Sequence, residues 1–265
     1  MSRPAAAAFA KLAVQQSFDL ASANYNQFTS LQRTIGDSLL EKRPDADHVD
    51  VLDIGSGTGY LTKQLCQIGD VENIYALDFS QGMLRETRQS MLGEPLSGLL
   101  CCDAESLPLK HKSLSAIYSN VTFQWCLNLP QVFNEVSCAL KQNGLFAFST
   151  FGPQTLCELK ASWAKADRAV HVNTFVEPET IERDMKLAGF KDINVTSETI
   201  LMYYDTPKQL MLDLKGMGAH NLNQGRNLGL TGVRAYKSIL NAYELLRTWQ
   251  GIPATFQAVY VYARK

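Results

Sequence analysis

The sequence predicts an α/β protein with a mostly parallel β-sheet and helices on both faces. Between residues 49 and 150, short apolar runs alternate with amphipathic helical stretches, a pattern typical of βαβ units with right-handed crossovers. The first apolar run leads into "VLDIGSGTGYL", in which an acid precedes three glycines at every second position. Asp78 and Asp103 close the next two apolar runs. These observations predict a ligand site along one edge of the sheet.

The N-terminal region is expected to be a separate helical unit. Residues from about 5 to 43 are expected to be helical, because polar residues interrupt the apolar ones and no glycine precedes Gly36. Pro44 then stops the helix and starts a connector. We expect residues 1–44 to form a helical lid and residues 45–265 to form the main domain.

Strands are expected where short apolar runs are bounded by turn residues, and helices where apolar residues recur with helical spacing. The expected strands cover residues 49–54, 73–78, 98–103, 114–120, 144–150, 193–204 and 254–265. The expected helices after the first strand cover residues 60–68, 81–89, 129–140, 153–166, 178–187 and 232–249. The connection between the last two strands is long, and residues 205–252 are expected to form a cap insertion.

The distribution of charge excludes one class of protein and suggests a kind of partner. The formal net charge of −1 argues against a generic nucleic-acid binder, which is usually strongly basic. Residues 206–265 carry eight Lys or Arg and two acids, a net of +6, whereas residues 1–205 carry 17 and 24, a net of −7. A basic segment on an acidic body fits an anionic partner or substrate, and a solvated basic face fits equally well.

The cysteines and the apolar windows indicate a soluble protein of the cytoplasm. The six cysteines form neither a CxxC pair nor a cluster with histidine at zinc spacing, so we expect reduced thiols and no metal site. The start, "MSRPAAAAFAKLAV", lacks the long apolar stretch of a signal peptide. No window reaches the length of a membrane span, so we expect neither a membrane nor a nucleic acid as a partner.

"DIGSGTG" is expected to be a turn against which a nucleoside-containing ligand lies. Glycine lets the chain turn sharply and lets a ligand approach the backbone closely. A dinucleotide fingerprint needs G-x-G-x-x-G, but counting from either Gly55 or Gly57 places a residue other than glycine at the last position. The spacing excludes the NAD motif and fits the turn that binds S-adenosylmethionine (SAM), to which Ser56 and Gly59 also belong.

Three acids at successive strand ends fit the parts of SAM in order. Asp53 precedes the glycines, where it reaches the ammonium group of the ligand directly or through water. Asp78 lies about 20 residues beyond the glycines, where a carboxylate accepts from both ribose hydroxyls. Asp103 is placed to accept from the adenine amino group, and capping or turn formation is the structural alternative for Asp78 and Asp103. The neighbouring cofactor candidates are Phe79, Met83 and Ala104, and core packing is an equally open alternative for Met83.

The motifs "DIGSGTG", "ALDFS", "CDAESLP" and "KQNGLFAF" resemble those of class I SAM-dependent methyltransferases over about residues 45–150. The resemblance implies a Rossmann-like fold with a seven-stranded, mostly parallel sheet in which the last strand is the antiparallel one. It also implies SAM as methyl donor and S-adenosylhomocysteine as product.

The methyl acceptor is expected beside the fourth strand, which ends in "YSNVTFQWC". Asn120, Gln124 and Trp125 are candidates to face the reacting methyl group, and Asn120 is also a cofactor candidate. Core packing is the alternative for Trp125 and for Phe123. No histidine stands where a general base would be expected. A carboxylate acceptor needs no base, because it is ionised at neutral pH.

The segment "LDLKGMGAHNLNQGR", within the C-terminal insertion, combines cations with glycines that allow a close approach. Lys215 or Arg226 is a candidate to hold a substrate carboxylate, Arg226 through a two-point fork. Plain surface charge is the alternative for each of these side chains.

Motifs outside the shared core resemble a narrower family. "FDLASANYNQFTSLQ", "VTFQWCLNL" and "LKGMGAHN" are similar to motifs of the malonyl-[acyl-carrier protein] O-methyltransferases of biotin synthesis, from about Phe18 to the end. The resemblance implies methylation of the free carboxylate of malonyl on acyl-carrier protein or of malonyl-CoA. It also implies that Tyr25 lines the active site as part of the lid, although packing within its helix is equally open. Ser56 stands where related turns often have Cys.

Two other functions stay open. Another SAM-dependent methyltransferase, acting on a free carboxylic acid or a quinone precursor, would keep the same cofactor site, although a quinone enzyme is expected to have a more apolar pocket and no basic cap. A SAM-binding protein without catalysis would keep the three acids and block the methyl side. The stretch "SNVTFQW" contains no evident block.

Overall fold

A single mixed sheet organises the molecule. The computed structural model describes residues 3–69, 71–165, 171–217 and 233–265. Within these residues the strands lie in the order β3-β2-β1-β4-β5-β7-β6. The strands are β1 (Asp50–Ile54), β2 (Asn73–Asp78), β3 (Gly98–Cys101), β4 (Leu114–Asn120), β5 (Leu140–Phe151), β6 (Lys191–Tyr204) and β7 (Ile252–Arg264).

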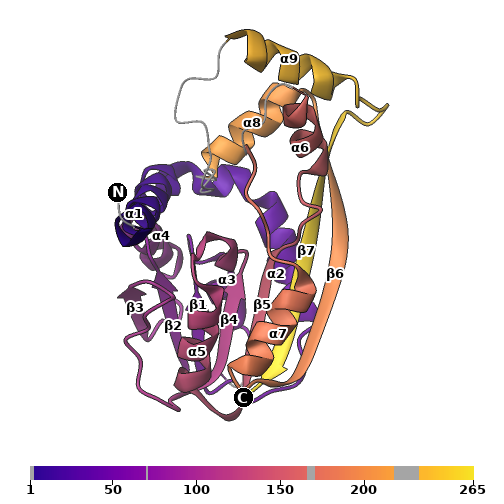
Figure 1. Cartoon of the computed structure of the whole chain (residues 1–265). Helices are drawn as coiled ribbons and strands as arrows, with labels where there is room; N and C mark the ends of the chain where they lie inside the picture. Colours follow the sequence, from indigo (N-terminus) through magenta and orange to yellow (C-terminus); the bar gives the residue numbers. More distant parts are fainter. Residues whose placement is uncertain (1–2, 70, 166–170, 218–232) are drawn as a thin grey trace.

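The pairing of the strands confirms the predicted topology. β1 pairs in parallel with β2 and β4, and β3 and β5 extend the parallel part on either side. β7 is antiparallel to both of its neighbours, β5 and β6. The last strand is therefore the antiparallel one, and the carboxyl ends of the parallel strands meet at one edge of the sheet (Figure 1).

Helices cover both faces of the sheet. The helices are α1 (Arg3–Ala21), η1 (Ser22–Phe28), α2 (Ser30–Glu41), α3 (Tyr60–Leu65), α4 (Gln81–Ser90), η2 (Phe123–Trp125), α5 (Leu129–Ala139), α6 (Cys157–Ala164), α7 (Pro178–Leu187), α8 (Pro207–Gly216) and α9 (Val233–Glu244). α2 and α3 pack on one face, and α5 and α7 on the other. Successive residues of β1 alternate between these cores, since Val51 belongs to the first and Leu52 to the second.

The N-terminal region differs from the single helical stretch that the sequence predicts. The 3-10 helix η1 and Thr29 separate α1 from α2. Short polar side chains make hydrogen bonds at the break, both local and to the glycine turn. The Ser22 hydroxyl donates to the Asp19 carbonyl at 2.9 Å, and Asn26 Oδ1 accepts from the Thr58 hydroxyl at 2.7 Å. The break lets the region fold back over the sheet edge.

Further elements differ from expectation, and α9 ends at Glu244 rather than near Trp249. α8 was not predicted, although Thr206 caps its first turn and Pro207 follows, because the glycine-rich run beyond it favours a loop. α6 starts only at Cys157, after Leu156 with a φ of 56°. The turn "KQNG" is an irregularity within β5, with Asn143 at a φ of 63°.

The site-bearing end of the molecule is covered from outside the sheet. Figure 1 shows α1 beyond the carboxyl ends of β1 to β3, and α8 and α9 beyond β4 to β7. α8 and α9 lie in the connection between β6 and β7, within the predicted insertion. Among the described helices, none is both long and apolar enough to cross a bilayer.

Candidate active site

A pocket lies at the carboxyl ends of the parallel strands, where the sequence predicts the cofactor. It encloses about 800 Å³ of empty space, counting the part open to solvent. Ten of the predicted residues line it: Tyr25, Gly55, Gly57, Asp78, Phe79, Met83, Asp103, Ala104, Asn120 and Trp125. We call this cavity the cofactor pocket.

The glycine turn makes one wall of the cofactor pocket by taking a backbone conformation that other residues rarely adopt. Gly55 has a φ of 74°, and a Cβ there would lie 2.1 Å from Thr122 Oγ1. Gly57 has a φ of 56°, and the nearest atom to a Cβ there is a Tyr25 ring carbon at 3.7 Å. Gly57 therefore keeps the backbone bare where the pocket is open, as close approach of a ligand requires.

Asp78 ties the end of β2 to the glycine turn and faces the pocket. Its Oδ2 accepts from the Gly57 amide at 2.9 Å, and its Oδ1 accepts from the Ser80 amide at 2.8 Å. Burial raises the pKa of Asp78 to about 6, and these amides oppose the rise. Each carboxylate oxygen keeps a second lone pair for a hydroxyl donor. This arrangement fits the ribose of a nucleoside.

Three predicted cofactor residues do not line the cofactor pocket: Asp53 near the end of β1, and Ser56 and Gly59 of the glycine turn. Asp53 is only 1% exposed, and its Oδ2 accepts from the Thr62 hydroxyl at 2.6 Å while its Oδ1 has no hydrogen-bond partner. Burial, with the nearby charge of Asp78, raises the pKa of Asp53 to about 7. Asp53 thus supports the turn from beneath rather than contacting the pocket directly.

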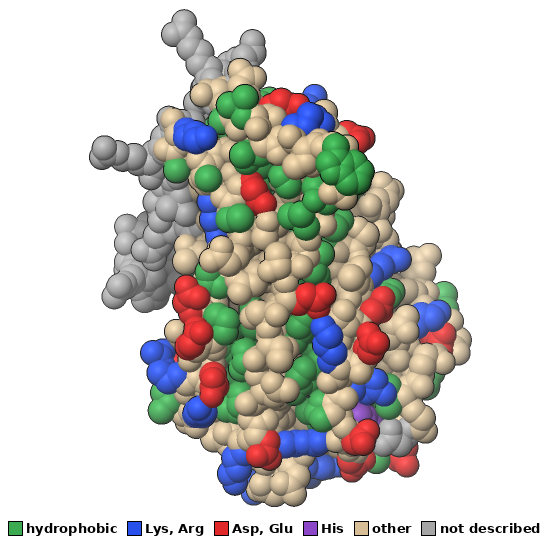
Figure 2. Space-filling model, turned by 90° about the vertical axis from the view of Figure 1, so that its right-hand side faces the viewer, with side chains coloured by type: hydrophobic (Ala, Val, Ile, Leu, Met, Phe, Trp, Pro, Cys, Tyr) green, Lys and Arg blue, Asp and Glu red, His purple; other side chains and the backbone are tan. Residues whose placement is uncertain are grey.

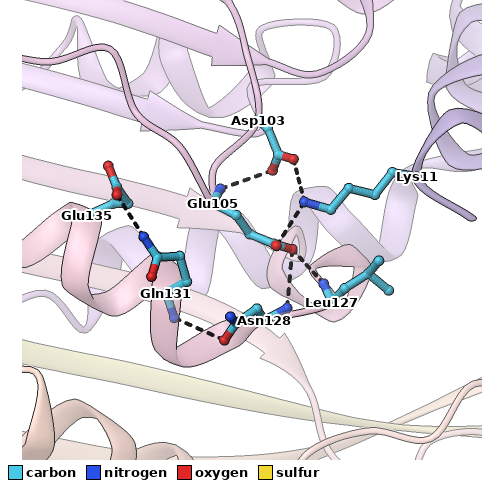
Figure 3. Close-up of polar contacts among 7 residues, drawn as sticks. All are labelled: Lys11, Asp103, Glu105, Leu127, Asn128, Gln131 and Glu135. Atoms are coloured by element: carbon cyan, nitrogen blue, oxygen red, sulfur yellow. Dashed lines mark hydrogen bonds and ion pairs between the residues drawn. The ribbon is translucent and has the colours of Figure 1, made fainter. Parts of the chain in front are cut away.

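At the end of the cofactor pocket near Asp103, an ion-pair cluster that was not predicted from the sequence joins α1 to the loop after β3. Lys11 of α1 pairs with Asp103 and with Glu105, the latter at 2.8 Å (Figure 3). Glu105 Oε1 in turn accepts from the amides of Leu127 and Asn128, at 2.6 Å and 3.2 Å. The predicted adenine acceptor, Asp103, is therefore held in place by a cation from the N-terminal helix.

Two more residues of α1 bind the same edge. The Gln15 amide donates to the Phe79 carbonyl at 2.8 Å. Asp19 Oδ1 accepts from the Ser80 hydroxyl at 2.6 Å and from the Gly82 amide at 2.8 Å, at the start of α4. Lys11, Gln15 and Asp19 recur every fourth residue and so share one face of the helix. That spacing was the sequence signal for this docking face.

A second cavity adjoins the cofactor pocket, and both cavities are lined mainly by apolar surface. It encloses about 770 Å³ of empty space and shares Phe18, Tyr25, Val121 and Trp125 with the first. The ring of Phe18 meets Trp125 edge-on at 5.4 Å between centroids and Tyr25 at 6.3 Å. These rings form a common aromatic wall. We call the second cavity the acceptor pocket.

The candidates at the end of β4 divide between the cavity and the core. Gln124 and Trp125 line the acceptor pocket. Gln124 is fixed by donation from its Nε2 to the Val121 carbonyl at 2.7 Å. The Asn120 amide donates to the Gln32 carbonyl at 2.8 Å, so Asn120 joins β4 to α2. Phe123 is 3% exposed and packs against other phenylalanines of the core.

Of the two cations predicted to hold a substrate carboxylate, the structure describes Lys215, which lines neither cavity. Lys215 is exposed on α8. Arg226 lies outside the described residues. Among the described lining residues of the acceptor pocket, the polar ones are Tyr25, Gln32, Gln124, Thr155, His171 and Asn173. His171 stacks on Trp163 with 3.4 Å between ring centroids. No cluster among the described side chains has the composition of a metal site.

The fold and the pocket at its strand ends define a class I methyltransferase. The Methyltransferase domain family matches residues 52–148. The YcgJ protein of Bacillus subtilis is similar in structure, with a TM-score of 0.62 and 16% identity over 87% of this chain and 97% of that chain. The SAM complex of phosphoethanolamine N-methyltransferase 2 from Haemonchus contortus has a TM-score of 0.57 and 16% identity over 93% of this chain and 57% of that chain. At such identities the likeness shows the fold alone.

Closer relatives place the chain within this class. Malonyl-[acyl-carrier protein] O-methyltransferase of Nitrosospira multiformis is 36% identical over 277 residues, covering 96% of this chain and 89% of the relative. The biotin biosynthesis bifunctional protein BioHC of Cellvibrio japonicus is 39% identical over 257 residues, covering 97% of this chain and 50% of the relative. The chain spans about half the length of the bifunctional relatives it matches. It belongs to the malonyl-[acyl-carrier protein] O-methyltransferase family.

Proposed function

We propose that this protein transfers a methyl group from SAM to the free carboxylate of malonyl carried on acyl-carrier protein. The product is the malonyl methyl ester of biotin synthesis, and malonyl-CoA is an alternative acceptor. The observation that carries the proposal is the pair of cavities joined at one aromatic wall, with the glycine turn and Asp78 lining the first and Gln124 lining the second. Membership of the family supports this choice of acceptor.

The described residues fit the ribose and the adenine of SAM. Asp78 presents a carboxylate to the cofactor pocket, and Gly57 leaves the backbone bare beside it. Asp103 and Ala104 lie at the end of the pocket beyond Asp78, where the adenine would be held. SAM, when bound, supplies a methyl group activated by a positively charged sulfur.

The reaction is an in-line displacement for which the chain supplies alignment rather than proton transfer. A lone pair of the acceptor carboxylate forms the new O–CH₃ bond while the S–CH₃ bond breaks, and both formal charges disappear. A dry pocket favours this neutralisation, because charges attract more strongly away from water. The apolar lining of the acceptor pocket and the wall formed by Phe18, Tyr25 and Trp125 exclude water at the junction.

Tyr25 is placed to orient the acceptor as a hydrogen-bond donor. It lines both cavities. Burial, with the nearby charge of Asp78, raises the pKa of Tyr25 well above its usual range. The hydroxyl therefore keeps its proton at neutral pH and can donate to a carboxylate oxygen, but it does not serve as a base.

We also propose that residues 1–44 act as a lid and residues 205–252 as a cap. Phe18 and Tyr25 come from the first segment, and Leu214 and Met217 of the second line the acceptor pocket. A basic cap suits an acidic carrier protein. The six free thiols agree with a place in the cytoplasm.

The experiment that tests the function is transfer of radiolabelled methyl from SAM to malonyl-acyl carrier protein. Succinyl- and acetyl-carrier proteins are the controls, and malonyl-CoA is assayed in parallel. We expect label on the malonyl form alone among the carriers, released by mild base as an ester would be. Label on none of these acceptors, with SAM still bound, would remove the proposed acceptor and return another small-molecule carboxylate or a quinone precursor to consideration.

A further inference from the structure

A third cavity opens on the glycine turn from the side of α2. It encloses about 410 Å³ of empty space and shares Tyr25, Gly55, Gly57 and Asn120 with the cofactor pocket. Arg33 of α2 also lines it. The cavity is thus a side chamber of the cofactor pocket that is lined by a cation.

Arg33 is held in place by neutral groups. Its guanidinium lies over the Tyr60 ring, 5.0 Å from the centroid, and its Nη2 donates to Asn26 Oδ1 at 3.2 Å. Asn26 Oδ1 also accepts from the Thr58 hydroxyl, which links the guanidinium to the glycine turn. The nearby Asp37 accepts from the Tyr60 hydroxyl at 2.7 Å.

The guanidinium has hydrogen-bonding capacity left over. Arg33 Nε is buried and has no hydrogen-bond partner. Among the described residues, Arg33 forms no ion pair with a carboxylate, whereas Lys11, Lys42, Lys63 and Lys141 all do. A guanidinium that is fixed, partly desolvated and unpaired is a preorganised site for a planar anion.

We infer that Arg33 binds the carboxylate of the methionine part of SAM. The inference rests on the proposed use of SAM. With the ribose at Asp78 and the adenine toward Asp103, the amino-acid end of the ligand extends the other way, over Gly55 and Gly57. Arg33 is the one cation among the described residues that line the chamber on that side.

The acceptor carboxylate is the competing ligand for this cation. Among the described lining residues, the chamber and the acceptor pocket have Tyr25 and Gln32 in common, and Arg33 does not line the acceptor pocket. Arg33 lines the cavity together with the glycine turn, at Gly55, Ser56 and Gly57. Its position therefore favours the cofactor.

Binding of two related ligands tests the inference. S-adenosylhomocysteine carries the carboxylate, and its decarboxylated form keeps the amine and the nucleoside. Calorimetric titration measures both dissociation constants for the wild type, Arg33→Gln, Arg33→Lys and the control Arg43→Gln, whose guanidinium donates to the Leu40 carbonyl away from these cavities. Thermal melting checks that each variant is folded.

We expect Arg33→Gln to weaken S-adenosylhomocysteine roughly 10- to 100-fold, as the loss of a charged hydrogen-bonded pair does, and to leave the decarboxylated ligand unchanged. Arg33→Lys restores part of the affinity, and Arg43→Gln changes neither ligand. An equal loss of affinity for both ligands would mean that Arg33 supports the fold of the pocket and does not bind the carboxylate. Unchanged affinity with a raised KM for the malonyl acceptor would assign it to the acceptor. A wild type that binds neither ligand would instead overturn the use of SAM itself.

Discussion

Asp78 joins two roles in one side chain. It accepts backbone amides from Gly57 and Ser80, and it faces the cofactor pocket. The first role shapes the glycine turn, and the second suits the ribose hydroxyls. A substitution must therefore distinguish loss of the turn from loss of the ligand contact.

Replacement of Asp78 should abolish SAM binding while the protein stays folded. Asp78→Ala removes both acceptors for ribose, and we expect a loss of at least roughly 100-fold in affinity. Asp78→Asn keeps the shape of the side chain and one acceptor oxygen, so its affinity for SAM should fall less. Calorimetric titration measures affinity, and circular dichroism checks the fold. Asp50→Asn, at the opposite end of the sheet beside Lys141, is the control. Unchanged affinity in Asp78→Ala would refute the cofactor assignment.

Asp53 should make the stability of the protein depend on pH. Burial raises its pKa to about 7 in the folded state, above the usual 3.8. Between these values the folded state holds a proton that the unfolded state has lost, so the contribution of Asp53 to the free energy of unfolding falls as pH rises. In Asp53→Asn this dependence is removed. The melting temperature of the variant minus that of the wild type should be more positive at pH 8 than at pH 5, and an equal difference at both would contradict the prediction.

At the scale of elements, α1 is the part of the lid with the clearest attachment. Lys11, Gln15 and Asp19 bind three points along the edge of the cofactor pocket, at Asp103, Phe79 and the start of α4. Phe18 on the same helix reaches the aromatic wall. A ligand held beneath α1 leaves most easily when these contacts open, so the docking of α1 should set the rate of ligand release.

Removal of the Lys11 ion pairs should speed the release of S-adenosylhomocysteine. Lys11→Met keeps the apolar stem of the side chain, and we expect release roughly two- to fivefold faster, as suits a partly exposed pair. Gln16→Met, on the exposed side of α1, is the matched control. Stopped-flow displacement measures the release rate at low and at high salt. At high salt the release rate of the wild type should approach that of the variant, because salt screens the ion pairs. Slower release from Lys11→Met would mean that Lys11 competes with the ligand for Asp103.

At the scale of the whole molecule, charge is unevenly placed along the chain. The net of +6 in residues 206–265 contrasts with −7 in the rest. Figure 2 shows acidic and basic side chains interspersed over the face that carries β6. A carrier protein attracted by the basic segment would therefore approach α8 and α9 rather than this face. Lys208 and Lys215 are exposed on α8.

Charge reversal on the cap should weaken use of the carrier-bound substrate. The double variant Lys208→Glu, Lys215→Glu is expected to raise the KM for malonyl-acyl carrier protein more than the KM for malonyl-CoA. Added salt should reduce the difference between wild type and variant in the KM for the carrier-bound substrate, because it screens the attraction. Arg234 and Lys237, whose side chains lie outside the described residues, are further candidates. Lys191→Glu, at the start of β6, is the control. Equal effects on both acceptors would argue against docking of the carrier protein at this cap.

The topology of the sheet and most of the cofactor pocket could be predicted because their signals are local. Strand and helix periodicities are read within a few residues, and a parallel sheet brings Asp78 and Asp103 to one edge wherever the turns lie. Asp53 was predicted to reach the ammonium group directly or through water, and its burial beneath the turn leaves this a prediction. Which oxygen of an acid faces a cavity depends on neighbours such as Thr62, and no pattern in the sequence encodes that choice.

The sequence by itself determined the strands and the helices between them in the parallel part of the sheet, the turn at Gly55 to Gly59, and the asymmetry of charge, since each is a property of nearby residues. Only the tertiary structure decided that Lys11 meets Asp103, 92 positions away, and that Arg33 faces the glycine turn. Such contacts depend on how η1 redirects the chain between α1 and α2. A small change in that angle would move every lid residue relative to the pocket, and local periodicity carries no information about the angle.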